Sequence, residues 1–217
     1  MPVEVSPIAH YHMGGIQVDT NMRSSLDGLY AAGEAVGGAN GANRLSGNAI
    51  TEALVFGEVA GRNAAVYSLA TTPSWPEQTA KSLLSDLLSL STKHRDDQTP
   101  DQMYESLKAL MWESVGPLRD ADSMRGALNA IQLLKPTTEN VSRKHLEPYD
   151  MAFASLCEFR AAVTVAEAVT LGALHRSESR GAHQRRDYPE MDNHQWRCSQ
   201  VIKKHGDNLN LSSIARP

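Results

Sequence analysis

The sequence has 217 residues, of which 41% are hydrophobic and 21% are charged, a composition typical of a globular protein with an apolar core. No apolar run approaches the ~20 residues that a membrane-spanning helix requires, and the first ten residues lack the basic and then apolar character of a secretory signal. Two cysteines are too few for a disulfide framework, so the composition favours a reducing, cytosolic setting.

The formal charge of −4 is unevenly distributed along the chain. Residues 1–70 and 71–175 are acidic on balance, whereas residues 176–217 carry eight Lys and Arg against five Asp and Glu. Acidic residues interleave with these cations, a mixture that nucleic-acid-binding surfaces seldom show. We therefore expect no nucleic-acid partner.

The first 61 residues contain ten of the fifteen glycines and predict short strands at Ile16–Asp19 and Leu29–Ala32. From Asn48 the apolar residues recur with the period of a helix. The predicted apolar face contains Ala49, Ala53, Phe56, Ala60 and Ala64, and the polar face contains Thr51, Glu52, Glu58 and Arg62.

Pro73 and Pro76 end this helix, which places a domain boundary near residue 72. The remainder is predicted to be helical, with Pro117, Pro136 and Pro148 as breaks. The predicted helices run over about Pro76–Leu90, Pro100–Val115, Arg119–Leu134 and Tyr149–Ser177. The last is apolar on nearly every side, which favours a place at the centre of a bundle.

Two segments of the glycine-rich part are candidates for chemistry. The first is His10-Tyr11-His12-Met13-Gly14-Gly15. A His-x-His pair can begin a metal site, but no further ligand follows at suitable spacing, so a glycine turn with surface histidines is the simpler interpretation and no metal is expected.

The second segment is the loop Gly33–Asn48, which leads from a predicted strand into the helix. The free N–H groups and positive dipole of a helix N-terminus suit an anion or a polarised carbonyl. Tight packing without function is the alternative. Arg44 is the only cation of the loop and has no local carboxylate except Glu34, which suits bidentate capture of a carboxylate ligand.

These segments resemble a known family. HYHMGG at 10–15, DGLYAAGEAVGGANGANRLSGNAITEALVFGEVAG at 27–61 and SESRGAHQRRDYPEMDNHQW at 177–196 are similar to the carboxy-terminal part of the flavoprotein subunit of succinate dehydrogenase and fumarate reductase. The resemblance implies an α+β fragment. Residues 1–72 would be the C-terminal piece of an FAD-binding domain, 73–178 an α-helical bundle, and 179–217 an extended tail.

The same resemblance implies a flavin enzyme that interconverts succinate and fumarate by hydride transfer to or from FAD. His10 and Arg44 would hold a carboxylate of the C4 dicarboxylate, and Glu34 would bond the ribityl or ribose hydroxyls of FAD. The backbone N–H groups of Ala49 and Ile50 would face the flavin pyrimidine edge. His12 is expected to have a structural or supporting role.

The sequence also departs from the family. Asn40 stands where the family usually has His, and Ala49-Ile50 stand for Ser-Leu, although contacts through the backbone are expected to persist. The family's amino-terminal half, with its dinucleotide-binding loop, capping domain and proton-delivering arginine, is absent from the sequence. We therefore expect a fragment, a split gene product or an artificially truncated protein that is not competent alone and holds no catalytic acid.

The resemblance further implies an iron-sulfur subunit and a membrane anchor as partners, and a position at the inner face of the cytoplasmic membrane through them. The segment Arg176–Trp196 mixes charges with one Trp, and we expect it at the contact with a partner or with the flavin domain. In that interpretation Arg185 and Arg186 are surface charges that can be reversed without loss of the fold. Ordinary solvated surface is the alternative.

Three alternatives remain for the function. L-aspartate oxidase shares the ESRG and DYPE character of the tail. Soluble fumarate reductases share the loop GGANGANRLSGNA but are not expected to share the helical domain and tail. A non-catalytic helical interaction module is the alternative outside enzymes.

Overall fold

The computed structural model describes residues 3, 10–72, 74–89, 99–137 and 151–216. The chain divides into two compact units, residues 1–74 and 75–217. The domain boundary near residue 72 stays a prediction. The helical bundle and the tail both lie in the second unit, and their separation at residue 178 stays a prediction. No helix among the described residues is long and apolar enough to cross a membrane.

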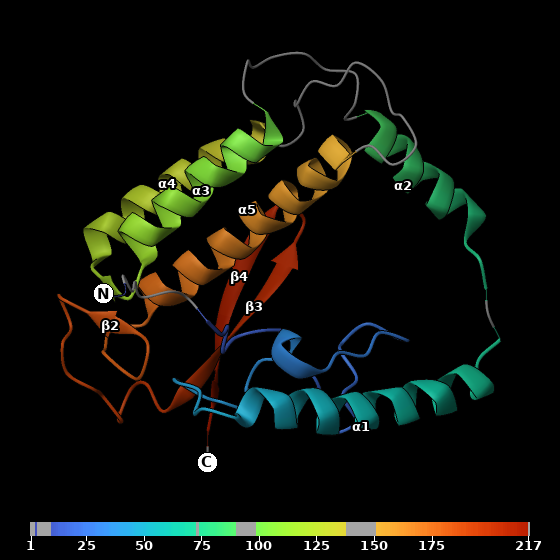
Figure 1. The fold of residues 1–217 in the computed structure, drawn as a ribbon, viewed down its shortest axis with the longest axis horizontal. Helices are drawn as coiled ribbons and strands as arrows, with labels where there is room; N and C mark the ends of the chain where they lie inside the picture. The colour runs from blue at the N-terminus through green and yellow to red at the C-terminus, as the bar shows by residue number, and fades with distance from the viewer. Residues whose placement is uncertain (1–2, 4–9, 73, 90–98, 138–150, 217) are drawn as a thin grey trace. The chain divides into compact units, whose positions relative to one another are not determined.

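The N-terminal unit consists of turns, a short 3-10 helix η1 (Gly33–Ala35) and a long helix α1 (Asn48–Ala70) (Figure 1). The predicted strands are reduced to single bridges, Ile16 with Val36 and Arg23 with Tyr30. The backbones of the two bridged segments approach closely at Gly15. A Cβ there would lie 2.4 Å from the carbonyl oxygen of Ala35 and 2.7 Å from the backbone nitrogen of Gly37, so a side chain would not fit. The glycines of this segment therefore serve a close approach of two chain segments.

Helix α1 begins where the sequence predicts, directly after Gly47, whose φ of 88° suits glycine. One side-chain prediction on this helix is wrong. Glu52, which the pattern assigns to the polar face, is 7% exposed, because Tyr11 and Asn40 cover it and donate hydrogen bonds to it.

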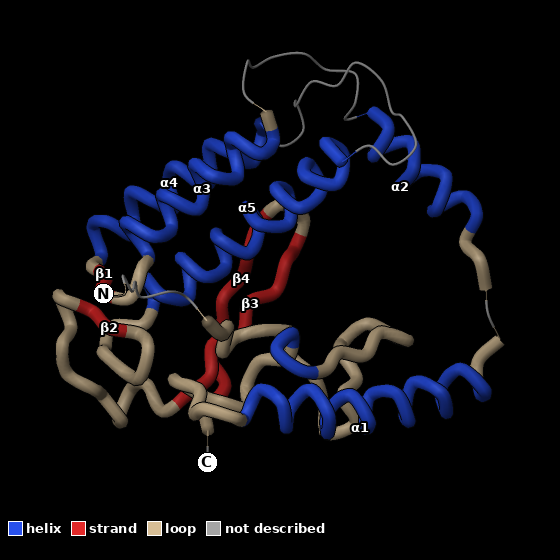
Figure 2. Tube along the Cα trace, viewed as in Figure 1, coloured by secondary structure: helices blue, strands red, loops and turns tan. Residues whose placement is uncertain are grey.

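The second unit contains α2 (Glu77–Ser89), α3 (Pro100–Val115), α4 (Ala121–Thr137) and α5 (Met151–His175). Figure 2 shows α3, α4 and α5 side by side. Helix α3 has the predicted bounds, fixed by a capping box in which Thr99 and Gln102 bond each other's backbone N–H. The predicted ends Leu90 and Tyr149 lie outside the described residues.

The predicted start of α4 at Arg119 is wrong, because Leu118–Arg119 form strand β1, which pairs in parallel with β2 (Gln184–Arg185). Helix α4 also passes through Pro136 and ends at Thr137 rather than before the proline. Helix α5 ends at His175, two residues before the predicted end at Ser177.

Helix α5 contacts both α3 and α4, as its apolar sequence predicts. The side chains at its centre are fully buried, and the core around them is continued by α3 and α4. This core contains Met103, Leu107, Ile131, Leu156, Phe159, Val163 and Ala166. Val165, on another face of α5, is 54% exposed, so the described residues do not cover the helix on every side.

The predicted helices end at Ser177, and within the predicted extended tail at 179–217 the sequence analysis missed a pair of strands. Strands β3 (Cys198–His205) and β4 (Asn208–Ala215) form an antiparallel hairpin whose two-residue turn is Gly206-Asp207, and both strands contact α5. Gly206 has a φ of 58°, the conformation that such tight turns require. Because a lone hairpin is marginal in water, its packing on α5 contributes to its stability.

Candidate functional site

The predicted site residues all belong to the N-terminal unit, and Arg44, Ala49 and Ile50 lie in the loop before α1 or in its first turn. The loop from Val36 to Gly47 carries Arg44 to the ring of Tyr11, with the guanidinium carbon 4.5 Å from the ring centroid. Because Tyr11 directly follows His10, the structure places Arg44 beside the segment that carries the other predicted substrate ligand.

Arg44 is half-buried, and its bonds within the chain leave part of the guanidinium unused. Its Nη1 donates to the carbonyl oxygen of Leu45 at 3.3 Å. Its Nε is buried, and no acceptor among the described residues lies within hydrogen-bond distance of it. A buried guanidinium N–H without an acceptor is costly, so this group is suited to an acceptor supplied from outside the chain.

Glu52 is the centre of the polar contacts behind Arg44, and the sequence analysis missed it. Its two carboxylate oxygens accept from the Tyr11 hydroxyl at 2.6 Å and from the Asn40 side-chain amide at 2.7 Å. The hydrogen bond to Glu52, together with burial, raises the pKa of Tyr11, so the phenol stays a proton donor. The burial of Glu52 could have been predicted from its position on the helix. Glu52 lies one helical turn before Phe56 and therefore borders the apolar face.

The other predicted residues are found in more open surroundings. His10 is exposed and makes no hydrogen bond or ion pair with another described residue. Glu34 is exposed, and its carboxylate accepts the backbone N–H of His12 at 2.8 Å. No three His, Cys, Asp or Glu side chains of the described ranges converge as metal ligands would.

The sequence predicts that the backbone N–H groups of Ala49 and Ile50, at the start of α1, face the flavin, and one of these two donors is free within the described residues. Ile50 N–H donates to the carbonyl of Gly47 at 3.3 Å, whereas Ala49 N–H has no acceptor in the described part of the chain. A Cβ on Gly38 or Gly47 would meet no atom within 4 Å, so the loop leaves open space at both positions. These features fit the flavin edge of FAD, which presents hydrogen-bond acceptors and, when reduced, negative charge to a helix N-terminus.

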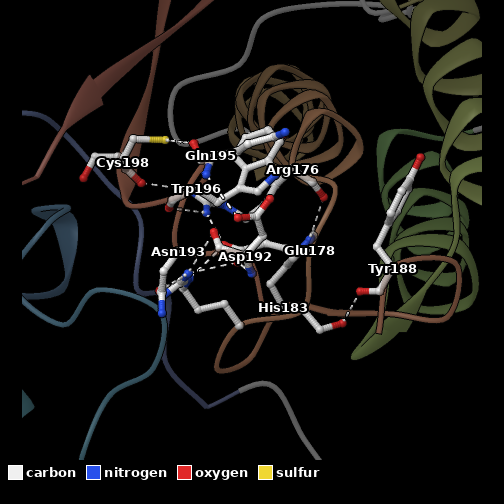
Figure 3. Close-up of polar contacts among 12 residues, drawn as sticks. Arg176, Glu178, His183, Tyr188, Asp192, Asn193, Gln195, Trp196 and Cys198 are labelled. Carbon is white, nitrogen blue, oxygen red and sulfur yellow. Dashed lines mark hydrogen bonds and ion pairs between the residues drawn. The ribbon is translucent and has the colours of Figure 1, made fainter. Parts of the chain in front are cut away.

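The tail motif forms a second polar cluster, within the C-terminal unit (Figure 3). Glu178 is fully buried and accepts from Arg176 Nη1 at 2.6 Å, from Arg180 Nε at 2.7 Å and from the Asp192 N–H at 2.8 Å. Burial alone would raise the pKa of Glu178, but these hydrogen bonds outweigh it and hold the pKa below its usual value.

Arg176 links this cluster to the β3–β4 hairpin. It donates to the carbonyl oxygens of Trp196 at 3.1 Å and Cys198 at 2.8 Å, and its guanidinium carbon lies 5.0 Å from the centre of the Trp196 ring. Trp196 is 8% exposed and packs edge-on against His175. Trp196, which the sequence analysis expects at a contact with a partner or with the flavin domain, is thus part of the core of this unit.

The prediction that Arg185 is a reversible surface charge is also wrong. Arg185 is 2% exposed and binds Asp187 through two hydrogen bonds of 2.7 and 2.6 Å. Its Nη1 donates to three carbonyl oxygens at the end of α5, those of Ala173, Leu174 and Arg176. Only Arg186, 63% exposed at its side chain and 3.8 Å from Asp120, has the surface character predicted for both.

His183 adds a pH-dependent contact to the tail cluster. Its Nδ1 faces Arg119 Nη1 at 3.1 Å and its Nε2 faces the Arg176 carbonyl at 3.2 Å. Since arginine only donates and a carbonyl only accepts, the ring is neutral with its proton on Nε2. Burial and the neighbouring Arg119 lower the pKa of His183 to about 4.

We therefore expect the C-terminal unit to lose stability on mild acidification. A folded-state pKa below the unfolded value means that the His183 contribution is complete above about pH 6.5 and disappears as the pH falls toward 4. The expected loss is roughly 1–2 kcal/mol after allowance for solvent screening. Urea midpoints between pH 7 and 4.5 measure it. The variant His183→Gln should show a flatter profile over this range, and an equal slope in both proteins would contradict the assignment.

Comparison with known proteins agrees with this arrangement. Residues 104–215 match the family described as "Fumarate reductase flavoprotein C-term", and residues 1–50 match an FAD-binding domain. The fumarate reductase flavoprotein subunit of Haemophilus influenzae is 36% identical over 199 residues, covering 88% of this chain and 33% of the relative. L-aspartate oxidase of Rhodospirillum rubrum is 37% identical over 194 residues, covering 88% of this chain and 60% of the relative.

A solved structure gives the same result for the fold. Mycobacterium smegmatis Sdh1 in complex with UQ1 superposes with a TM-score of 0.85 at 33% identity, over 94% of this chain and 35% of the other. The chain thus spans about a third of the length of most of the relatives it matches. The flavoprotein names of these relatives and the FAD-binding match indicate FAD as the cofactor. The chain belongs to the succinate dehydrogenase and fumarate reductase flavoprotein family and corresponds to its C-terminal part.

Proposed function

We propose that this chain supplies the substrate-binding arginine and part of the flavin contact of an FAD-dependent oxidoreductase that interconverts succinate and fumarate. The observation that carries the proposal is the Nε of Arg44, buried without an acceptor in the described part of the chain. A planar guanidinium donates two parallel hydrogen bonds to one carboxylate, and both C4 substrates present carboxylates.

The residues of the N-terminal unit then act as follows. Arg44 binds one substrate carboxylate, and the Tyr11 ring against it limits the positions that the guanidinium can take. His10, which has no partner among the described residues, is free to donate a hydrogen bond to the same substrate. FAD, when bound, supplies the hydride acceptor and donor.

The flavin contacts of the proposal use the backbone more than side chains. Ala49 N–H is available to the pyrimidine edge, whereas Ile50 N–H would first have to release the Gly47 carbonyl. Glu34 keeps one carboxylate oxygen for a hydroxyl of FAD while the other accepts from His12. A helix N-terminus stabilises an adjacent anion by roughly 0.3–1 kcal/mol, which favours the reduced flavin.

L-aspartate oxidase activity is the second candidate, supported by the 37% identical relative from Rhodospirillum rubrum. L-aspartate carries the same two carboxylates as succinate, so capture by Arg44 does not distinguish the two substrates. The distinction depends on groups that face the amine at C2.

We also infer an iron-sulfur subunit and a membrane anchor as partners, at the inner face of the cytoplasmic membrane. The name of the Haemophilus influenzae relative as a subunit supports a multisubunit protein. A solved relative, 26% identical with a TM-score of 0.87, is titled a quinol-fumarate reductase with menaquinol molecules, which supports delivery of electrons to or from a quinone pool.

Anaerobic reduction of the bound flavin tests the proposal. The FAD-loaded protein that contains this chain is mixed with succinate or with L-aspartate, and bleaching of the flavin absorbance is followed. We expect succinate to bleach the flavin and fumarate to restore it. Bleaching by L-aspartate alone would favour the oxidase, and no bleaching by either substrate would favour a non-catalytic module.

A further inference from the structure

We propose that Glu52 is a positioning residue for the substrate site, because its carboxylate connects helix α1 to the two segments that carry His10 and Arg44. This inference rests on the proposed function and adds a residue to it. Glu52 forms no hydrogen bond or ion pair with Arg44; it acts through Tyr11 and Asn40.

The first reason is the unusual state of this carboxylate. Glu52 is 7% exposed, and no Lys, Arg or His of the described ranges lies within ion-pair distance of it. Its hydrogen-bond donors among the described residues are neutral, the Tyr11 hydroxyl at 2.6 Å and the Asn40 amide at 2.7 Å. A buried carboxylate without a cation is costly, and packing alone would be served equally well by an apolar side chain.

The second reason is the path from Glu52 to Arg44. The Tyr11 hydroxyl donates to Glu52 while the face of the same ring lies 4.5 Å from the Arg44 guanidinium carbon. Donation to an anion adds electron density to the phenol and strengthens its attraction for a cation over the ring. Glu52 thus fixes the ring and increases its hold on Arg44, whose Nε has no acceptor among the described residues.

The third reason is the hydrogen bond that the Asn40 side-chain amide donates to Glu52. Asn40 belongs to the same loop as Arg44, four residues before it, and its bond to Glu52 fastens the loop to the first turns of α1. One carboxylate therefore joins the segment 10–15, the loop and the helix. Precise placement of a bidentate group is the condition for tight carboxylate capture, since small misplacements weaken both hydrogen bonds together.

Fumarate binding to the oxidised, FAD-loaded protein that contains this chain tests the proposal, with the flavin absorbance as the signal for the dissociation constant. Glu52→Gln keeps the volume but leaves one acceptor oxygen for the two donors, the Tyr11 hydroxyl and the Asn40 amide. Tyr11→Phe keeps the ring under Arg44 and removes only the hydroxyl. We expect each change to raise the fumarate dissociation constant roughly tenfold, the factor that corresponds to one net hydrogen bond.

Glu58→Gln is the matched control, because Glu58 lies on the same helix, is exposed and pairs with Arg62 outside the site. It should leave fumarate binding unchanged. Flavin content is measured for every variant, so that loss of cofactor is separated from loss of substrate binding. Tyr11→Phe keeps the test valid if Glu52→Gln folds poorly, since the half-buried Tyr11 tolerates loss of its hydroxyl more readily.

A double-mutant cycle separates positioning from general stability. If Glu52 acts through Arg44, Glu52→Gln should change fumarate binding by less than about a factor of two when Arg44 is already lysine. An equal effect in both backgrounds, or a lowered thermal midpoint with unchanged fumarate binding, would leave Glu52 a purely structural residue. If Arg44→Lys alone has no effect, the proposed function itself fails and this inference falls with it.

Discussion

Arg185→Ala is expected to destabilise the C-terminal unit by about 3–5 kcal/mol, because carbonyl oxygens at the end of α5 would lose their buried donor at a cost of roughly 1–3 kcal/mol each. Arg185 connects the end of α5 to the start of α4 through its partner Asp187. Its guanidinium satisfies three carbonyl oxygens at the end of α5, while its partner Asp187 accepts the N–H of Ala121 at the start of α4. Without Arg185 these carbonyls lose their donor, and Asp187, whose pKa is lowered to about 2 mainly by Arg185, loses its counter-charge.

The adjacent arginine provides the control for this prediction. Arg186 is exposed and lies 3.8 Å from Asp120, so Arg186→Ala should change stability by no more than about 0.5 kcal/mol. Urea denaturation followed by far-ultraviolet circular dichroism gives both midpoints. Equal shifts for the two variants would mean that the buried network around Arg185 does not hold the helix ends.

Glu178→Gln is expected to cost a similar amount, about 3–5 kcal/mol, because two arginines then lose the anion between them. The Glu178 carboxylate is fully buried and accepts two hydrogen bonds from Arg180 and one from Arg176. Glutamine retains one acceptor oxygen, and its amide group would point donors at donors. Tm measured by differential scanning calorimetry provides the comparison with the parent protein.

Two further variants make this prediction specific. Glu190→Gln, an exposed position in the same segment, should leave Tm unchanged. Adding Arg180→Leu to Glu178→Gln should recover part of the loss, since one of the unpaired cations is removed. A double variant that is less stable than Glu178→Gln by the full effect of Arg180→Leu would show that the two residues act independently.

The helices could be predicted from the sequence because their signals are local. Thr99, Pro100 and Gln102 fix the start of α3 within four residues, and the predicted and observed bounds agree. The pairing of Arg119 with Arg185 could not be predicted, because it joins positions far apart in the chain. The β3–β4 hairpin was missed although Gly206-Asp207 between two eight-residue segments is a hairpin signal.

In the candidate site too, local features could be predicted from the sequence, whereas contacts between distant positions could not. Arg44 stood out because a single cation in a run of small residues is unusual, and the structure leaves its Nε without an acceptor in the described residues. Glu52 did not stand out, because its burial depends on Tyr11, 41 positions earlier. Charge pattern also failed in the tail, where Glu178 and Arg185 resemble surface residues in sequence but are buried and form ion pairs.

The substrate role of Arg44 is tested most directly by fumarate binding to the FAD-loaded protein that contains this chain. Arg44→Lys keeps the charge and loses the planar pair of donors, so the binding free energy should weaken by roughly 1.5–3 kcal/mol, at least tenfold in Kd. His10→Ala should act in the same direction. Arg62→Lys, an exposed position on α1, is the control and should bind as the parent does.

The flavin spectrum and FAD content of each variant are recorded in the same titration, because a substrate ligand and a cofactor ligand then give different results. The account predicts weaker fumarate binding by Arg44→Lys with an unchanged flavin spectrum. Fumarate binding by Arg44→Lys at the parental Kd, with the same FAD content, would contradict it.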